Sequence, residues 1–356
     1  MVSYGLVINF LKEEGLVLGL VRKLSSLGER QAIRLIDQIL AKGGSSDVLG
    51  DDCAALSLGR QYLLVTTDLI ARQTHMPAGM TPYQIGWMLT AVNLSDIAAK
   101  GGTPLGLVVT YGLPPDTTDV FLKEMTRGAM TCAQRCGTRI VGGDTKEAAD
   151  ITLSGTAFGL VNKTEFMPRK GCHPGDVIAV TGTLGKAAAG YTALQHKETQ
   201  RSITRGLFEP WPRLKEGRLL AKRQVVTSSM DLSDGLSASL YQLQELNHVG
   251  FTIDATLLPV SKELQTIKRR HPDIDTQRLL LHFGADYELL VTLPKTRFQV
   301  TATALKRQGC SLTRVGTVTK GTKILLDDGT KTQVLPNEGW EHFTPHPWGR
   351  LPQTPL

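Results

Sequence analysis

The 356-residue sequence lacks the marks of a membrane, secreted or zinc-binding protein. Its five cysteines form no Cys-x-x-Cys pair and their number is odd, which argues against both a disulfide framework and a zinc site. Residues 1–20 are apolar but are interrupted by Lys12, Glu13 and Glu14, and they show neither the basic start of a signal peptide nor an unbroken span of about 20 apolar residues. We therefore expect a cytoplasmic protein with reduced thiols.

Long runs of one charge are also missing. The balance of 40 Lys and Arg against 33 Asp and Glu is +7, yet the densest basic cluster, residues 268–270, has only three members. A nucleic-acid-binding arm needs a longer block, and no helix-turn-helix, finger or aromatic-basic signature is present. With 41% hydrophobic and 21% charged residues, the composition is typical of a globular protein, and the length favours two domains. The net charge indicates a general attraction for anionic ligands.

The common nucleotide-binding signatures are absent as well. The sequence contains no Gly-x-Gly-x-x-Gly and no His-Arg-Asp with Asp-Phe-Gly. Residues 182–187, Gly-Thr-Leu-Gly-Lys-Ala, resemble a phosphate loop. However, the first glycine is missing at the required spacing, and Ala187 stands where a Mg²⁺-binding Ser or Thr belongs. We interpret this segment as a strand-to-helix turn.

What the sequence does contain is a set of aspartates at the ends of apolar runs, several beside glycine: Asp51, Asp52, Asp68, Asp96, Asp144, Asp231 and Asp234. One Asp-Gly pair is typical of a turn, but a turn does not account for the whole set. Carboxylates are the oxygen ligands that Mg²⁺ prefers. Because bare carboxylates repel polyphosphate, an all-aspartate site needs bridging cations. The set therefore predicts a Mg²⁺–nucleotide enzyme.

Apolar spacing predicts an α+β protein with two mixed domains, each a sheet covered by helices. Helices are expected at residues 29–42, 81–100, 117–136, 185–196, 235–247 and 296–308, and strands at 61–67, 105–112, 138–142, 151–161, 176–181, 251–254 and 287–293. The helix at 81–100 has Thr81 as its cap and Pro82 in its first turn. Loop residues at 163–175 predict the domain boundary. This gives an N-terminal extension of unknown role (1–28), an N-terminal domain (29–165) and a C-terminal domain (166–356).

In their order, these motifs resemble those of the thiamine-monophosphate kinases. They are Leu49–Ala54, Thr66–Leu69, Ala91–Ala99, Gly142–Thr145, Pro174–Gly182, Asp231–Leu236 and Asp286–Leu289. The resemblance runs from about residue 29 to residues 340–343. It implies the two-domain aminoimidazole-ribonucleotide-synthetase-like (PurM-like) fold. In that fold the N-terminal α/β domain binds ATP and Mg²⁺ and pairs with its partner's in a homodimer, while the C-terminal α/β domain closes over the nucleotide.

The resemblance also implies a set of site residues. The Mg²⁺ ligands would be Asp52, Thr66, Thr67, Asp68, Asp96, Asp144, Asp231 and Asp234. ATP contacts would fall on Gly143, Asp144, Arg169 and Ser233, and the thiamine-phosphate pocket would include His75 and Trp340. A guanidinium suits phosphate oxygens, and an indole offers a flat face to a ring.

The implied reaction is in-line transfer of the γ-phosphoryl group of ATP to thiamine phosphate, giving thiamine diphosphate and ADP. A phosphate monoester has a second pKa of about 6, so the acceptor is mostly dianionic at neutral pH and needs no general base. The protein then has to neutralise the charge of the two phosphate groups and align them.

The sequence departs from the family at the acceptor pocket. Ala285 stands where the family has a glutamate, and Asp286 and Glu288 are the candidates to replace its carboxylate. The glycine common before His75 is also missing. Two alternatives therefore stay open: another ATP-dependent enzyme of the superfamily with a different acceptor, and a nucleotide-binding regulator without turnover.

Overall fold

The computed structural model describes residues 22–42, 50–345 and 348, which fall into two compact units. The smaller unit combines residues 1–48 with 341–346 and contains helices α2 (Leu24–Leu27) and α3 (Glu29–Lys42). The helix predicted at 29–42 is confirmed, but its large apolar side chains are not buried: Ile36 and Ile39 are 52% and 69% exposed. Most of the predicted N-terminal extension lies outside the described residues.

The larger unit, residues 49–340 with 347–356, begins with a five-stranded sheet in the order β1-β2-β5-β3-β4. The strands are β1 (Ala54–Leu58), β2 (Gln61–Ala71), β3 (Thr103–Leu113), β4 (Ile140–Glu147) and β5 (Thr152–Asn162). All neighbours are antiparallel except β3 and β4, which are parallel and are joined through a helix. Strands β2 and β4 are longer than predicted, so Asp68 and Asp144 lie within strands rather than after them.

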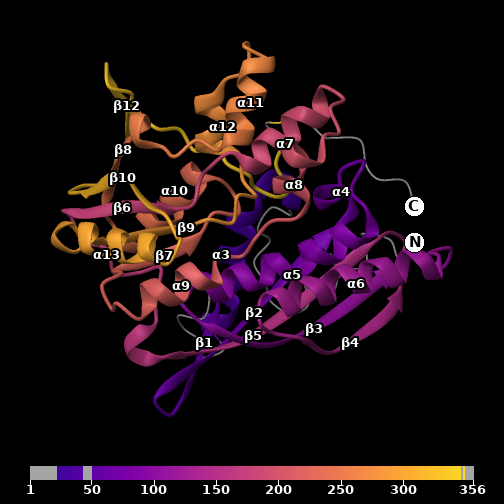
Figure 1. Cartoon of the computed structure of the whole chain (residues 1–356). Helices are drawn as coiled ribbons and strands as arrows, with labels where there is room; N and C mark the ends of the chain where they lie inside the picture. The colour runs from indigo at the N-terminus through magenta and orange to yellow at the C-terminus, as the bar shows by residue number, and fades with distance from the viewer. Residues whose placement is uncertain (1–21, 43–49, 346–347, 349–356) are drawn as a thin grey trace. The chain divides into compact units, whose positions relative to one another are not determined.

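Two helices, α5 (Pro82–Ala99) and α6 (Asp119–Arg135), lie side by side over this sheet (Figure 1). The predicted start of α5 is confirmed: Thr81 and Gln84 form a capping box, and Pro82 occupies the first turn. The two helices approach closely at Gly86 and Gly128, where an added Cβ would come within 1.8 Å of a backbone oxygen of the other helix. Fifteen of the 18 residues of α5 are buried, which its apolar composition on all sides requires.

The second half of this unit contains a seven-stranded mixed sheet in the order β12-β11-β8-β10-β6-β9-β7. Its strands are β6 (Asp176–Thr181), β7 (Ser228–Asp231), β8 (Gly250–Asp254), β9 (Leu289–Pro294), β10 (Leu312–Thr319), β11 (Ile324–Asp327) and β12 (Thr332–Val334). The only parallel pair among these described strands is β8 with β11. The predicted α+β class is confirmed. The two sheets are separated by residues 163–175, where the domain boundary was predicted, although its position stays a prediction.

The remaining helices are α4 (Arg72–His75), α7 (Lys186–Gln195), α8 (Arg201–Phe208), α9 (Leu214–Ala221), α10 (Leu236–Asn247), α11 (Lys262–Arg270), α12 (Thr276–His282) and α13 (Lys295–Arg307), with single turns η1 (Lys163–Glu165) and η2 (Ala255–Leu257). The sequence predicted α7, α10 and α13 but missed the short helices α2, α4, α8, α9, α11 and α12 and the strands β1, β7 and β10–β12. Among the described residues, no helix combines the length and apolar character needed to span a membrane.

The end of α5 reaches beyond the first sheet. Ala98 and Ala99 pack in a core cluster with Val177 of β6, Leu289 of β9 and Leu220 of α9. Helix α5 therefore carries side chains from the first sheet to the second. The functional site lies at this junction.

Candidate metal centre

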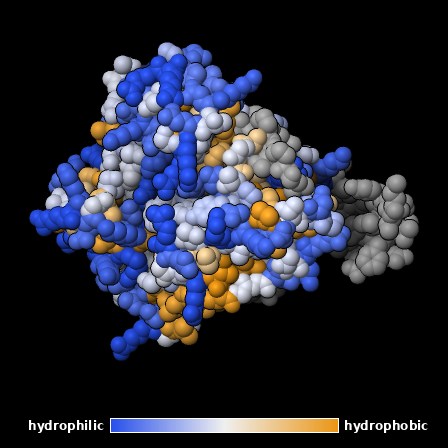
Figure 2. All heavy atoms as spheres, turned by 45° about the vertical axis from the view of Figure 1, so that its right-hand side comes forward, coloured by the Kyte–Doolittle hydropathy of each residue, from blue (hydrophilic) through white to orange (hydrophobic). Residues whose placement is uncertain are grey.

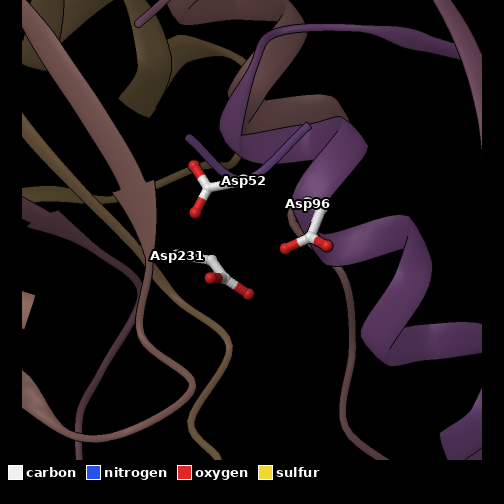
Figure 3. A group of neighbouring side chains, drawn as sticks. All are labelled: Asp52, Asp96 and Asp231. Carbon is white, nitrogen blue, oxygen red and sulfur yellow. The ribbon is translucent and has the colours of Figure 1, made fainter. Parts of the chain in front are cut away.

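Three aspartates from distant parts of the sequence meet where α5 leaves the first sheet. Asp52 precedes β1, Asp96 lies in the last turn of α5, and Asp231 is the last residue of β7. Carboxylate oxygens of the three lie within 4.8 Å of one another. Figure 3 shows the three carboxylates turned toward a common space. The structure thus brings together three of the predicted Mg²⁺ ligands.

Hydroxyl groups orient two of these carboxylates. Thr66 Oγ1 of β2 donates to Asp96 Oδ2 at 2.5 Å, and Ser95 Oγ of α5 donates to Asp231 Oδ2 at 2.5 Å. Each bond holds one oxygen of its carboxylate, so the Oδ1 atoms of Asp96 and Asp231 remain available to a cation. Thr66 was predicted as a metal ligand; in this structure its hydroxyl donates to Asp96, and its role as a ligand stays a prediction.

A further polar contact fixes α5 against β2. The Asn93 side-chain oxygen accepts the backbone N–H of Asp68 at 3.1 Å, and its amide donates to the Leu89 carbonyl at 2.9 Å. Gly155 of β5 makes room for this side chain, because a Cβ there would stand 2.4 Å from the Asn93 amide nitrogen. The contact places Asp68 beside the last turns of α5.

Asp52 differs from the other two aspartates because two cations hold it. Arg169 donates from Nε to Asp52 Oδ1 at 2.9 Å and from Nη2 to the same oxygen, and Lys100 Nζ lies 2.7 Å from Asp52 Oδ2. The remaining guanidinium donor, Nη1, bonds Gln242 at 3.1 Å. Arg169 was predicted to contact ATP; in this structure its guanidinium is bound to Asp52 and Gln242.

The electrostatics of the centre follow from burial and crowding. Burial, reinforced by Asp52, raises the pKa of Asp231 to about 7, and burial together with Asp234 and Asp52 raises that of Asp68 to about 6. Burial and the neighbouring carboxylates also raise the pKa of Asp96 well above its usual value. Burial alone would raise the pKa of Asp52 too, but Arg169 and Lys100 outweigh it and lower that pKa.

These residues fit a hard divalent cation. The atoms available to a metal are all carboxylate oxygens, which repel one another, and Mg²⁺ favours oxygen ligands of this kind. Asp52 Oδ2 is buried, and its partner among the described residues is the Lys100 ammonium group at 2.7 Å, which takes one of its two lone pairs. It therefore keeps lone-pair capacity for a metal.

Asp68 and Asp234 extend the centre. Their negative charges are close enough to affect neighbouring groups. Asp234 raises the pKa of Asp68, and both Asp68 and Asp234 raise the pKa of the buried Tyr287 phenol. Ser233, a predicted ATP contact, precedes Asp234, and its carbonyl accepts the Ala285 N–H at 2.7 Å. The segments at 231–235 and 285–288 therefore run side by side at the centre.

The side chains of two predicted ligands, Thr67 and Asp144, do not reach the centre in this chain. Side chains alternate along a strand, so Thr67 points away from the face that carries Thr66 and Asp68; it bonds the Gly155 carbonyl at 2.9 Å. Asp144 on β4 is exposed and pairs with Lys146 at 3.7 Å.

The sheet register gives the distance of Asp144 from the centre. Asp144 aligns with Thr110, Ser154 and Leu69 across β3, β5 and β2. Three strand spacings, about 14 Å, therefore separate it from the position next to Asp68. The structure does not bring Asp144 to the centre within one chain. Gly143, its neighbour, lies on the same outer strand, where a Cβ would meet the Val109 carbonyl at 2.0 Å.

The two predicted pocket residues lie at the end of helix α4 and in the loop that contains Trp340. His75 ends α4, and its Nδ1 lies 2.7 Å from Thr74 Oγ1. Trp340 is tied to the centre through its backbone, since its N–H donates to the Asp234 carbonyl at 2.9 Å. Their roles as pocket residues stay predictions.

The segment resembling a phosphate loop is a strand-to-helix turn, as interpreted from the sequence. It joins β6 to α7, and the Asp286 carboxylate occupies the N-terminus of α7, where it accepts the N–H groups of Gly185, Lys186 and Ala187 at 2.6, 2.9 and 3.2 Å. This site of α7 is thus filled by a side chain rather than left for a phosphate.

Glu288 is similarly engaged. Its fully buried carboxylate pairs with Arg213 at 2.5 Å and Lys186 at 3.1 Å, and accepts from Thr181 at 2.8 Å. Neither Asp286 nor Glu288 therefore has a free carboxylate to replace the glutamate that Ala285 lacks. The expectation that one of them compensates is wrong for this structure.

Sequence reasoning missed two groups at the centre, Ser95 and Lys100. Ser95 lies in the motif Ala91–Ala99, and its position directly before Asp96 could have indicated a role at the centre. Lys100 carried no such signal, because a lysine at a helix C-terminus is ordinarily a solvated partner of the helix dipole.

Family models for AIR synthase related proteins match most of the chain: the N-terminal domain at residues 50–161 and the C-terminal domain at residues 173–328. Thiamine-monophosphate kinase of Methanospirillum hungatei is 36% identical over 300 residues, covering 83% of this chain and 94% of that protein. The Escherichia coli enzyme of the same name is 32% identical, covering 83% and 91%.

Solved structures agree with these relatives. AaThiL complexed with AMPPCP and TMP matches with a TM-score of 0.81 and 28% identity, covering 91% of this chain and all of that one. Thiamine monophosphate kinase from Aquifex aeolicus matches with a TM-score of 0.74 and 26% identity, covering 86% and 98%. A chain of the HypE–HypF complex shares the fold at a TM-score of 0.70, with 18% identity.

Proposed function

This chain belongs to the thiamine-monophosphate kinase family of AIR synthase related proteins, and we propose that it transfers the γ-phosphoryl group of ATP to thiamine phosphate, giving thiamine diphosphate and ADP. It is a phosphotransferase with the two-domain PurM-like fold and uses ATP as co-substrate. The observation that carries the proposal is the convergence of Asp52, Asp96 and Asp231, in a chain aligned with these kinases over 83% of its length.

Mg²⁺ is the proposed cofactor. Asp52, Asp96 and Asp231 would hold it, and Asp68 and Asp234 are the proposed further ligands next to them. Bound there, Mg²⁺ would neutralise the phosphate oxygens and allow a polyphosphate to approach the carboxylates. The protein's own contribution is to hold these carboxylates in place through Thr66 and Ser95.

The acceptor brings its own nucleophile. Thiamine phosphate is mostly dianionic at neutral pH, so no general base is assigned to this chain. Ser233, Gly143 and Arg169 are proposed ATP contacts, and His75 and Trp340 are proposed acceptor contacts. Arg169 would have to exchange Asp52 for a phosphate oxygen to act in this way.

A homodimer is also proposed. The five-stranded sheet exposes several large apolar side chains on strands whose other face is covered by α5 and α6: Leu56, Leu58, Leu69, Leu105 and Val141. In Figure 2 apolar residues gather at the bottom of the view, where Figure 1 has this sheet. A second copy packed on it would cover these side chains. We propose that the partner's Asp144 completes the centre, which this chain's own Asp144 does not reach.

A cytoplasmic location is proposed for the reaction. All five cysteines are free, and four of them are buried. Unpaired thiols are typical of a reducing compartment.

The direct test incubates purified protein with MgATP and thiamine phosphate and quantifies thiamine diphosphate and ADP, which should form in equal amounts. Unphosphorylated thiamine should give no product. Asp96→Asn should reduce turnover by at least about 100-fold, since it removes a charged ligand from the centre. The matched control is Asp119→Asn on α6, where the aspartate is 73% exposed and pairs only with Lys123 among the described residues.

ATP binding without product would instead favour the regulator. Product from a different phosphorylated acceptor, with none from thiamine phosphate, would refute the assigned acceptor but would still support phosphoryl transfer from ATP.

A further inference from the structure

Lys100 is a fully buried cation that the proposed reaction does not use. It follows the last residue of α5, and none of its surface is exposed. Lysine is almost never fully buried unless it is paired. Three oxygens surround its Nζ: Asp51 Oδ1 at 2.5 Å, Asp52 Oδ2 at 2.7 Å and the Ser229 carbonyl oxygen at 2.7 Å. The ammonium group has three donors, so this environment can satisfy it completely.

The partners of Lys100 come from both halves of the larger unit. Asp51 and Asp52 precede the first strand of the five-stranded sheet, whereas Ser229 lies in β7 of the seven-stranded sheet. Ser229 Oγ also donates to the Ala99 carbonyl at 2.7 Å, so Ser229 alone is bonded twice to the end of α5. Asp231 is two residues beyond Ser229 on the same strand. Lys100 thus links the strand that carries Asp231 to the segment that carries Asp52.

The contact with Asp52 has a consequence for the metal centre. Arg169 holds Asp52 Oδ1 and Lys100 holds Asp52 Oδ2, so the carboxylate is fixed from two sides. Without Lys100, Arg169 would be the one cation left on Asp52 among the described residues, and a guanidinium favours a two-oxygen grip on a carboxylate. Such a bidentate pair would turn both oxygens of Asp52 toward Arg169 and away from Asp96 and Asp231.

We propose that Lys100 is a positioning residue for the metal centre: its ammonium group holds Asp52 in the orientation in which it can share a divalent cation with Asp96 and Asp231. Lys100 itself touches neither substrate nor metal. The inference rests on the Mg²⁺-dependent function proposed above. Groups that orient metal-binding carboxylates typically change metal affinity by 10- to 100-fold when they are removed.

The test uses Lys100→Met, which keeps an unbranched side chain of similar length and removes the charge. Chelator-treated protein is titrated with MgCl₂ without nucleotide, and thermal unfolding is followed at each concentration. We expect Mg²⁺ to stabilise the wild-type protein and the midpoint concentration to rise 10- to 100-fold in Lys100→Met. The Mg²⁺ concentration for half-maximal formation of thiamine diphosphate should rise in parallel.

Two further variants separate positioning from a purely structural role. In an Asp52→Asn background, Lys100→Met should shift the Mg²⁺ midpoint no further, because the lysine acts through that carboxylate. Ser229→Ala removes the hydroxyl bond to Ala99 but keeps the carbonyl near Lys100, so it should lower stability without shifting the midpoint. If Lys100→Met does not fold, Lys100→Gln replaces it in the same cycle.

A Mg²⁺ midpoint in Lys100→Met within about twofold of wild type, or tighter, overturns the inference, as does full additivity with Asp52→Asn. Absence of any Mg²⁺ stabilisation of the wild-type protein overturns it too. The titration contains neither ATP nor thiamine phosphate. A protein that fails the kinase assay but shows the expected shift therefore refutes the proposed reaction and supports the role of Lys100.

Discussion

Asp68 and Asp231 are acids whose folded state holds protons more tightly than the unfolded chain does. Their pKa values rise to about 6 and about 7 from 3.8, because burial and neighbouring carboxylates disfavour the charged forms. A raised folded-state pKa contributes stability that is fully present below the unfolded pKa and is lost as pH rises through the folded pKa. The window for these two groups therefore runs from about pH 4 to about pH 7. The lowered pKa of Asp52 acts with the opposite sign, but below its ordinary value of 3.8.

From this we predict that the melting temperature of the protein in chelator falls by a few degrees between pH 5.5 and pH 8. Adding MgCl₂ at pH 8 should recover the loss, since a divalent cation replaces the protons. Asp231→Asn should flatten the profile in chelator because it removes one of the titrating groups. Differential scanning calorimetry across this range measures the effect. A melting temperature that is constant or rises toward pH 8 would contradict it.

Helix α7 depends on a carboxylate from outside its own sequence. Its N-cap position is Gly185, which makes no side-chain cap, and Asp286 supplies the acceptor for three N–H groups of the first turn instead. The four N–H groups at a helix start need partners from outside the helix. Asp286 is therefore a cap that is distant in sequence, 100 residues beyond Lys186.

We expect Asp286→Ala to lower the free energy of unfolding by roughly 1–2 kcal/mol, the usual cost of losing a cap. Asp286→Asn keeps one oxygen acceptor and should lose less. Urea unfolding of the two variants, compared at pH 7.5, measures the difference. Equal stability of Asp286→Ala and wild type would show that other groups satisfy the first turn of α7.

For the whole molecule, the exposed apolar side chains of the five-stranded sheet predict self-association. A cluster of this kind on a folded protein is typical of an interaction surface. We expect the wild-type protein to be a dimer by light scattering and Leu105→Lys, at a position that is 51% exposed, to be monomeric. Val300→Lys on α13, where the side chain is 52% exposed and lies away from this sheet, is the matched control and should stay dimeric.

The same variant tests the placement of Asp144. If a partner's Asp144 completes each centre, the monomeric Leu105→Lys should keep its stabilisation by Mg²⁺ through Asp52, Asp96 and Asp231 but lose turnover. A wild-type monomer with full activity would refute both the dimer and the shared site.

The sequence by itself determined the local structure and the type of chemistry. Helix α5 was predictable because Thr81 and Pro82 mark its start and its apolar composition requires burial, and these are properties of neighbouring residues. The aspartate set and its association with Mg²⁺ were predictable because hard cations select oxygen ligands whatever the fold. The short elements α8, α9, α11 and α12 were missed, since a few residues carry too little periodicity.

Only the tertiary structure decided which aspartates meet and what holds them. Thr67 and Asp144 are separated from the centre by strand alternation and sheet order, both of which depend on pairing between distant strands. Lys100 is buried against Asp51 and Asp52 because α5 ends between two sheets, a position that its own sequence does not specify. The burial of a charge depends on the whole fold around it, and that is why its role could be seen only there.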